Sequence, residues 1–323
     1  MSELDYTYAA ARIRVLELSL FSASVLEQLI GCSSYEEALK FLMEKGWGGS
    51  EAEANADEIL DRESRRTWEV VRELCPDMSI FDVMRLPDLF HNLKAAIKQA
   101  GREQENPHIF YQDTKISPEE MLRVIREKDY LALPKNMQKA AQEATEAFLQ
   151  TGDGQLCDII VDQAALEAIK EAGKEAKEEI LRQYAESMVA VADIKIAVRA
   201  QKTGKNPEFM RRAMAECESL NTDRLIQAAV SGKDALMAYL EETDYAGGAA
   251  ALAESASAFE RWCDNRMIEI IRPQKYKAFS IGPVVAYAIA RENEIKTVRI
   301  ILSGKANGLP DDSIRERVRE MYV

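Results

Sequence analysis

The chain has 323 residues, of which 55 are acidic and 42 basic, so its formal net charge is −13. An acidic chain without blocks of basic residues is poorly suited to bind nucleic acid or anionic lipid headgroups. Hydrophobic residues make up 47% of the chain, and there are only 15 glycines and 9 prolines. This composition excludes a disordered protein and favours an ordered, mostly helical one with two or three structural units.

Neither a targeting segment nor a redox centre is predicted. The start, "MSELDYTYAAARIRV", lacks the basic beginning and apolar run of a signal peptide, and no stretch reaches the 18 apolar residues that span a bilayer. No Cys-x-x-Cys pair occurs, so we expect small, buried, reduced cysteines in a cytoplasmic protein. The five cysteines are Cys32, Cys75, Cys157, Cys217 and Cys263.

Helical patterns follow one another along the chain, with apolar residues three and four apart. In chain order we expect helices within 8–30, 32–48, 63–74, 88–98, 116–130, 193–199, 220–230, 257–271, 294–300 and 309–323. Helix-favouring residues also dominate 164–188. Turn signals lie at "TGDG" (151–154), "GG" (247–248) and "SIGP" (280–283).

An internal repeat with a period of 101 residues divides the chain. "NLKAAIK" (92–98), "DIKIAVR" (193–199) and "EIKTVRI" (294–300) align a polar, a branched apolar and a lysine position. Each copy is expected to end near a glycine, at Gly101, Gly204 or Gly304, and to be followed by a helix with a polar or proline start. The repeat predicts units at 1–86, 87–185 and 186–283, and a C-terminal half-unit at 284–323 with a fourth copy of the helix pair.

One stretch, "IILSGKANGLPDD" (300–312), superficially resembles a phosphate-binding loop. That loop needs glycine where Arg299 stands and Ser or Thr where Ala306 stands, so nucleotide binding is not expected. We interpret the stretch as a joint between two helices, in which Gly304 ends one helix and Pro310 opens the next. Lys305 is then expected to be a solvated loop residue.

Catalytic chemistry is not indicated elsewhere. His91 and His108 lack a second ligand at metal-site spacing, no Gly-x-Ser-x-Gly turn occurs, and the paired acids fall on helix starts and polar faces. Trp47, Trp68 and Trp262 are too dispersed for a base-stacking platform and are expected in the core. We therefore expect no catalytic residue, no cofactor and no metal.

The repeated polar columns are the candidate interaction residues. Two interpretations of the lysine column stay open. Each lysine extends to solvent at the edge of a core helix or pairs with the acid or amide that precedes it, or the three lysines line a shared pseudo-threefold axis. The candidate interface residues are Asn92, Lys94, Asp193, Lys195, Arg199, Glu294, Lys296 and Arg299.

The C-terminal segment "ARENEIKTVRIILSGKANGLPDDSIRERVREMYV" (290–323) closely resembles the end of the C subunit of V/A-type rotary ATPases, whose eukaryotic counterpart is the d subunit. The segments 8–30 and 88–98, the length and the threefold repeat agree with this resemblance. The first unit departs from the repeat, because "ARIRVLE" lacks the acid or amide before its helix. Which chain ends pack together is therefore left open.

The resemblance implies an all-α, funnel-like socket of three helical units and a non-catalytic function. Such a subunit sits on the cytoplasmic face of the membrane, without spanning it, between the central shaft subunits and the proteolipid rotor ring. There it transmits torque between ATP hydrolysis or synthesis and H⁺ or Na⁺ transport. The alternative is a helical-repeat adaptor for soluble partners, in which the period reflects solenoid stacking. The sequence does not distinguish H⁺ from Na⁺, or synthesis from pumping.

Overall fold

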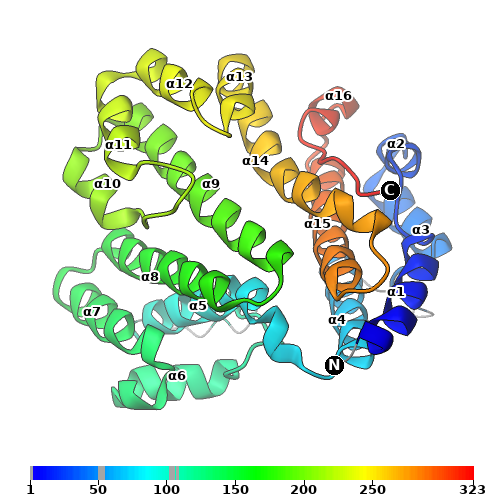
Figure 1. Ribbon diagram of the computed structural model, residues 1–323, viewed down its shortest axis with the longest axis horizontal. Coiled ribbons are helices and arrows are strands. Elements are labelled where there is room, and N and C mark those ends of the chain that lie inside the picture. The colour runs from blue at the N-terminus through cyan, green and yellow to red at the C-terminus, as the bar shows by residue number, and fades with distance from the viewer. Residues whose placement is uncertain (1–2, 50–54, 102–105, 107–108) are drawn as a thin grey trace. The chain divides into compact units, whose positions relative to one another are not determined.

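The structure is a computed structural model that describes residues 3–49, 55–101, 106 and 109–323. Every regular element in these ranges is a helix, which confirms the predicted all-α class (Figure 1). The chain forms two compact units. We call residues 79–246 the middle unit, and residues 1–78 together with 247–323 the terminal unit.

The middle unit is built around α8, which packs against α5, α7 and α9. Its core includes Leu93 and Ile97 of α5, Met121 of α6 and Val161 of α8. The helices are α5 (Asp82–Ala100), α6 (Pro118–Glu127), α7 (Lys135–Thr151), α8 (Gly154–Glu175), α9 (Glu179–Thr203), α10 (Pro207–Ala213), α11 (Thr222–Ser231) and α12 (Lys233–Glu241), with short 3₁₀ helices η1 (Met78–Phe81) and η3 (Tyr130–Ala132).

The terminal unit joins both ends of the chain around α15, which packs against α1, α2, α3, α4 and α14. Its core includes Leu29 and Leu42 from the N-terminal segment and Val298 and Ile301 from α15. The helices are α1 (Glu3–Glu17), α2 (Ala23–Ile30), α3 (Tyr35–Glu44), α4 (Ala56–Leu74), α13 (Ala246–Glu254), α14 (Ala256–Ile271), α15 (Gly282–Ala306) and α16 (Asp311–Arg315), with η4 at Arg272–Tyr276.

Predicted helix starts coincide with side-chain caps. Ser34 accepts a hydrogen bond from the backbone N–H of Glu37 at 3.1 Å, and Ser117 accepts one from Glu120 at 3.2 Å. Asn221 accepts from the N–H of Arg224 at 2.9 Å. These caps satisfy backbone donors that the first turn of a helix leaves free, and so fix where α3, α6 and α11 begin.

Three predicted features of glycine segments and helix ends are wrong. Gly304 lies inside α15, where an added Cβ would meet Ile314 at 2.7 Å. The helix ends at Ala306, and Gly308 with φ +64° follows it.

Gly247 and Gly248 form no turn but lie in α13, each under the ring of Trp262. The last helix is α16 alone, shorter than the predicted 309–323. Gly101 and Gly204 do follow the ends of α5 and α9; Gly204 is left-handed with φ +66°, whereas Gly101 has φ −88°.

Candidate functional site

The polar residues that open the three repeat copies are all completely buried: Asn92, Asp193 and Glu294. Each accepts a hydrogen bond from a backbone N–H in an irregular segment that precedes a short helix. The Oδ1 atom of Asn92 accepts from Tyr111 at 2.9 Å, and Asp193 Oδ1 accepts from Ala215 at 3.2 Å. The carboxylate of Glu294 accepts from Phe21.

These contacts give the column a common structural role. In the first two copies the bonded segment follows the long helix in sequence and leads to α6 or α11. In the third copy it comes from the N-terminal end of the chain and leads to α2. A buried backbone N–H without an acceptor lowers the stability of the folded chain. By accepting such a bond, Asn92, Asp193 and Glu294 each fix the segment that packs beside their helix. Any part of these residues in an interface stays a prediction.

The chain meets the electrostatic cost of burying these acceptors in three ways. Asn92 is uncharged. Burial raises the pKa of Asp193 to about 8, although the N–H of Ala215 acts against this, so its carboxyl group is mostly protonated at neutral pH. Burial also raises the pKa of Glu294, and here the guanidinium of Arg291 pairs with the carboxylate.

Arg291 connects α15 to α4 through a buried network. Its side chain is only 6% exposed and binds Glu63 as well as Glu294, and its Nε atom lies 3.4 Å from Thr67 Oγ1. The guanidinium also lies over the ring of Trp47, 5.1 Å from the centroid. Removing one member of such a network leaves the others buried and unpaired, so loss of any one of them should destabilise the terminal unit.

The lysine column pairs with neighbouring helices. Lys94 Nζ lies 2.7 Å from Asp162 Oδ1 of α8, and Lys296 Nζ lies 2.7 Å from Asp264 Oδ1 of α14. Both lysines thus pair with an acid on another helix, not with the polar residue two positions earlier. Lys195 belongs to the middle unit, where it lines a cavity.

That cavity, of about 770 Å³, is the α5–α9 cavity, and it brings together three of the predicted interface residues. Lys94 of α5 and Lys195 and Arg199 of α9 line it, together with apolar side chains such as Ile159 and Leu166 of α8. Lys296 and Arg299 lie in the terminal unit, where Arg299 pairs with Asp57 at 2.6 Å. Asp88, Asp158 and Asp162 line it as well, so the cavity carries charges of both signs beside its apolar side chains.

Residues 9–317 match the family described as ATP synthase (C/AC39) subunit. The chain belongs to this family.

Named relatives of this family member extend over nearly its whole length. The C subunit of the V-type sodium ATPase of Enterococcus hirae is 22% identical over 326 residues, which cover 99% of both chains. The C subunit of the A-type ATP synthase of Methanocaldococcus jannaschii is 24% identical over 341 residues, covering 96% of this chain and 85% of the relative. The corresponding protein of Methanobrevibacter smithii is 22% identical, with 96% and 87% covered. The resemblance seen in the C-terminal segment is confirmed.

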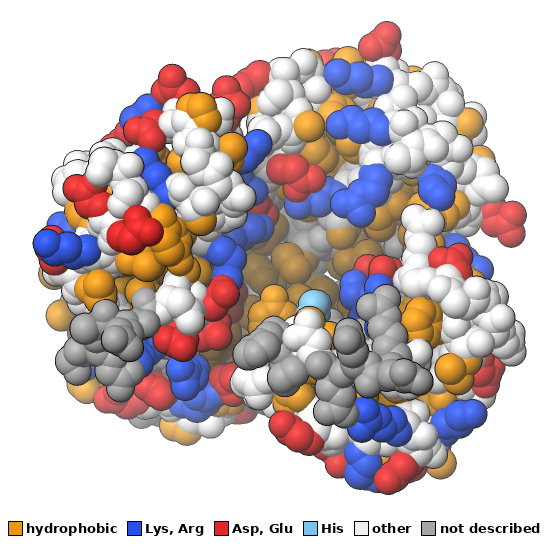
Figure 2. Space-filling view, turned by 180° about the vertical axis from the view of Figure 1, so that it is seen from behind, with side chains coloured by type: hydrophobic (Ala, Val, Ile, Leu, Met, Phe, Trp, Pro, Cys, Tyr) orange, Lys and Arg blue, Asp and Glu red, His pale blue; other side chains and the backbone are white. Residues whose placement is uncertain are grey.

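None of the described helices of this C/AC39 family member combines the length and the apolar character needed to cross a bilayer. On the face in Figure 2, acidic and basic side chains are interspersed with hydrophobic ones. That face does not present one field of a single sign despite the net charge of −13.

Sequence reasoning missed Asp88, which also lines the α5–α9 cavity. Burial raises its pKa to about 6, while the nearby His91 and Arg85 act in the opposite direction. His91 lies within α5, and its Nε2 atom is 2.8 Å from the carbonyl oxygen of Ile109. His108 lies outside the described residues. No local pattern identifies Asp88, because its burial depends on helices that are distant in sequence.

Lys305 corrects the predicted joint. Its side chain is 8% exposed and donates to the carbonyl oxygen of Cys32 at 2.6 Å and to Asp311 at 2.8 Å. The prediction of a solvated loop lysine is wrong, because α15 continues past this residue and turns it toward the N-terminal segment. The lysine that suggested a phosphate loop instead links both ends of the chain.

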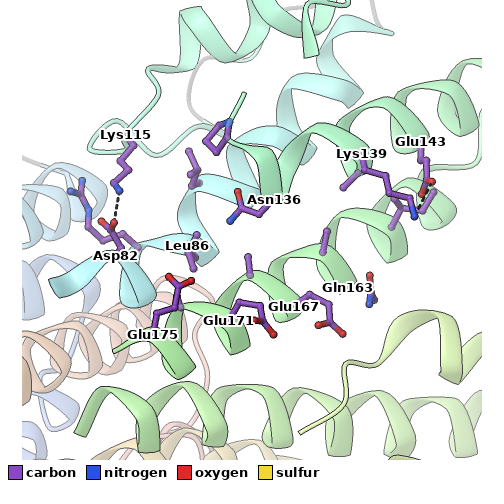
Figure 3. A pocket seen from close by; sticks show the side chains of 18 of the residues that line it. Asp82, Leu86, Lys115, Asn136, Lys139, Glu143, Gln163, Glu167, Glu171 and Glu175 are labelled. Atoms are coloured by element: carbon purple, nitrogen blue, oxygen red, sulfur yellow. Dashed lines mark hydrogen bonds and ion pairs between the residues drawn. The ribbon is translucent and has the colours of Figure 1, made fainter. Parts of the chain in front are cut away.

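A second cavity of about 600 Å³ lies where α7, α8 and the start of α5 meet (Figure 3). Glu167, Glu171 and Glu175 follow one side of α8, each one turn from the next. Among the lining residues Lys115 pairs with Asp82, and Lys139 lies 3.7 Å from Glu143. In the part of the chain that the structure describes, no three His, Cys, Asp or Glu side chains gather as a metal site.

Proposed function

We propose that this chain is the central-stalk C subunit of a V/A-type ATPase or ATP synthase. It links the rotor shaft to the membrane proteolipid ring and transmits torque between ATP hydrolysis or synthesis and H⁺ or Na⁺ transport. The observation that carries the proposal is the family match over residues 9–317, with relatives named as C subunits over almost their full length. The subunit has no active site of its own in this proposal, and it lies peripherally on the cytoplasmic face.

The proposal includes a socket of three related helical units. The recurring contact from Asn92, Asp193 and Glu294 to a backbone N–H supports it, because the same joint occurs at each repeat. In this scheme the half-unit at 284–323 is completed by the first unit, 1–86, because the partner of Glu294 is Phe21. The units at 87–185 and 186–283 carry the other two joints.

A non-catalytic coupling protein must be stiff and must offer surfaces to two partners. The long helices α8, α9 and α15 and the buried network at Arg291 supply stiffness. The α5–α9 cavity carries charges of both signs, and within it Lys195 and Arg199 of α9 supply a seat for acids of a shaft surface.

Depletion and add-back test the function. Membranes that lack this subunit should lose ATP-driven ion transport while the ATP-driven head keeps its hydrolysis activity, and the purified full-length chain should restore transport. Transport that is unaffected by depletion would contradict the proposal and favour the helical-repeat adaptor.

A further inference from the structure

Exposed large hydrophobic side chains gather on two segments of the terminal unit. Tyr8 and Val15 of α1 are 67% and 60% exposed, and Leu18, directly after α1, is 85% exposed. Tyr276 and Phe279 are 90% and 67% exposed. These are five of the eleven such residues in the described chain, so they are not scattered singly, as ordinary surface residues are.

Hydrogen bonds hold the two segments together. The Nη2 atom of Arg14 donates to the carbonyl oxygen of Gln274 at 2.6 Å and to that of Lys277 at 2.9 Å. The segment that carries Tyr276 therefore lies beside α1. We call the surface formed by Tyr8, Val15, Leu18, Tyr276 and Phe279 the α1–loop surface.

The spacing on α1 suits a second helix. Tyr8, exposed Ala11 and Val15 follow one another at steps of three and four residues, which is the spacing of the seam of a helix pair, and Leu18 follows in the turn after α1. The opposite side of α1 already packs into the unit through residues such as Ile13. A helix that lies on a lipid surface presents a broad apolar face, whereas this seam is narrow.

The charges beside the seam favour an acidic occupant. Residues 270–291 contain no acid, and exposed Lys277 and Arg12 form no ion pair with another described residue. Two acids of the neighbouring described residues are already engaged, because Glu17 pairs with Arg14 and Glu320 pairs with Arg272. The surface is thus locally basic in a chain of net charge −13.

We propose that the α1–loop surface binds an acidic amphipathic helix of another protein chain. Apolar residues of that helix would cover the seam, and its acids would meet Arg12 and Lys277. The proposal depends only on this surface and holds or fails independently of the rotary role.

Photo-cross-linking tests whether the α1–loop surface binds such a helix. The full-length chain is expressed in its own cells with a photo-cross-linking residue in place of Val15. The matched control carries the same residue at Leu131, which is 83% exposed in the middle unit. We expect an adduct at position 15, about fivefold above the control, whose peptide has heptad-spaced apolar residues and an excess of Asp and Glu. Combining Arg12→Glu with Lys277→Glu should lower its yield by about fivefold.

Four results of the same experiment would overturn the proposal. Three are adducts with another occupant: lipid, a second copy of this chain, or a basic segment. The fourth is an adduct yield at position 15 no higher than at position 131. A second variant, Leu18→Glu, distinguishes loss of binding from loss of folding. It should abolish the adduct while the urea midpoint and helical content stay unchanged, since Leu18 is almost fully exposed.

Discussion

The backbone N–H of Phe21 donates to the carboxylate of Glu294, 273 residues later in the sequence, and both residues are buried. This bond joins the N-terminal segment to the long helix α15 inside the terminal unit. Asn92 and Asp193 make the same kind of bond inside the middle unit, but with segments only 19 and 22 residues away. The chain ends therefore complete together a joint that the two earlier copies build locally.

Replacing Glu294 tests this joint. Glu294→Ala removes the acceptor for Phe21 and one of the two carboxylates of Arg291, so we expect the free energy of unfolding to fall by about 2–4 kcal/mol. Urea denaturation followed by circular dichroism measures the change. Lys296→Ala is the control, because its pair with Asp264 is half-exposed and should contribute less than about 1 kcal/mol. Equal effects of the two changes would show that the joint is not a major constraint.

Asp193 makes the stability of the middle unit pH-dependent. Its pKa rises from the ordinary 3.8 to about 8 in the folded chain, so the folded state binds the proton more tightly than the unfolded state. Its stabilising contribution is complete below about pH 4 and is lost as the pH rises toward 8. The maximum slope is about 1.4 kcal/mol per pH unit.

Asp193→Asn keeps the acceptor for Ala215 and removes the ionisation. The variant should therefore gain stability over the wild type progressively between pH 5.5 and 8.5, as measured by urea midpoints at several pH values. Asp223→Asn is the control, because the side chain of Asp223 is 80% exposed. A stability difference for Asp193→Asn that stays constant across this pH range would contradict the assignment.

The crossing of α8 and α9 depends on a glycine. A Cβ at Gly173 would overlap the Cβ of Ala185, so Gly173→Ala should force the helices apart and lower the free energy of unfolding by about 1–3 kcal/mol. Gly154→Ala, on the same helix, meets only the flexible Lys98 at 3.8 Å and should be neutral or slightly stabilising. Thermal melts of both variants decide this; a Gly173→Ala protein as stable as Gly154→Ala would disprove the close approach.

Charge reversal in the α5–α9 cavity tests its role in the proposed interface. The double variant Lys195→Glu, Arg199→Glu should reduce ATP-driven ion transport by about tenfold or more, or release the ATP-driven head. The reason is that the new carboxylates would face the acids of the shaft surface, and like charges that face each other weaken an interface. The helical content of the isolated chain should not change. Lys202→Glu, exposed on α9 outside the cavity, should have little effect. Full coupling in the double variant would assign these positions to the scaffold.

Much of the fold is predictable from local sequence, because helix periodicity and capping residues act over a few positions. Ser34, Ser117 and Asn221 mark helix starts that the structure reproduces. The errors occur where a distant side chain decides. Gly304 continues a helix because Ile314 packs on it, and Gly248 lies in α13 because Trp262 covers it.

The site was predictable only in part. The 101-residue period found Asn92, Asp193 and Glu294, but it did not reveal their backbone partners, since Phe21 lies at the other end of the chain. Lys195 and Arg199 do line one cavity with Lys94, and Asp88, which joins them, carried no local signal. Burial and partner choice are tertiary properties, so periodicity alone does not specify them.

The most direct test of the central claim is affinity purification of the tagged full-length chain from gently solubilised membranes, followed by mass spectrometry. We expect recovery of nucleotide-binding subunits, a small stalk subunit and a proteolipid together. Recovery of soluble proteins alone, without a proteolipid even after cross-linking, would contradict a role between shaft and rotor ring.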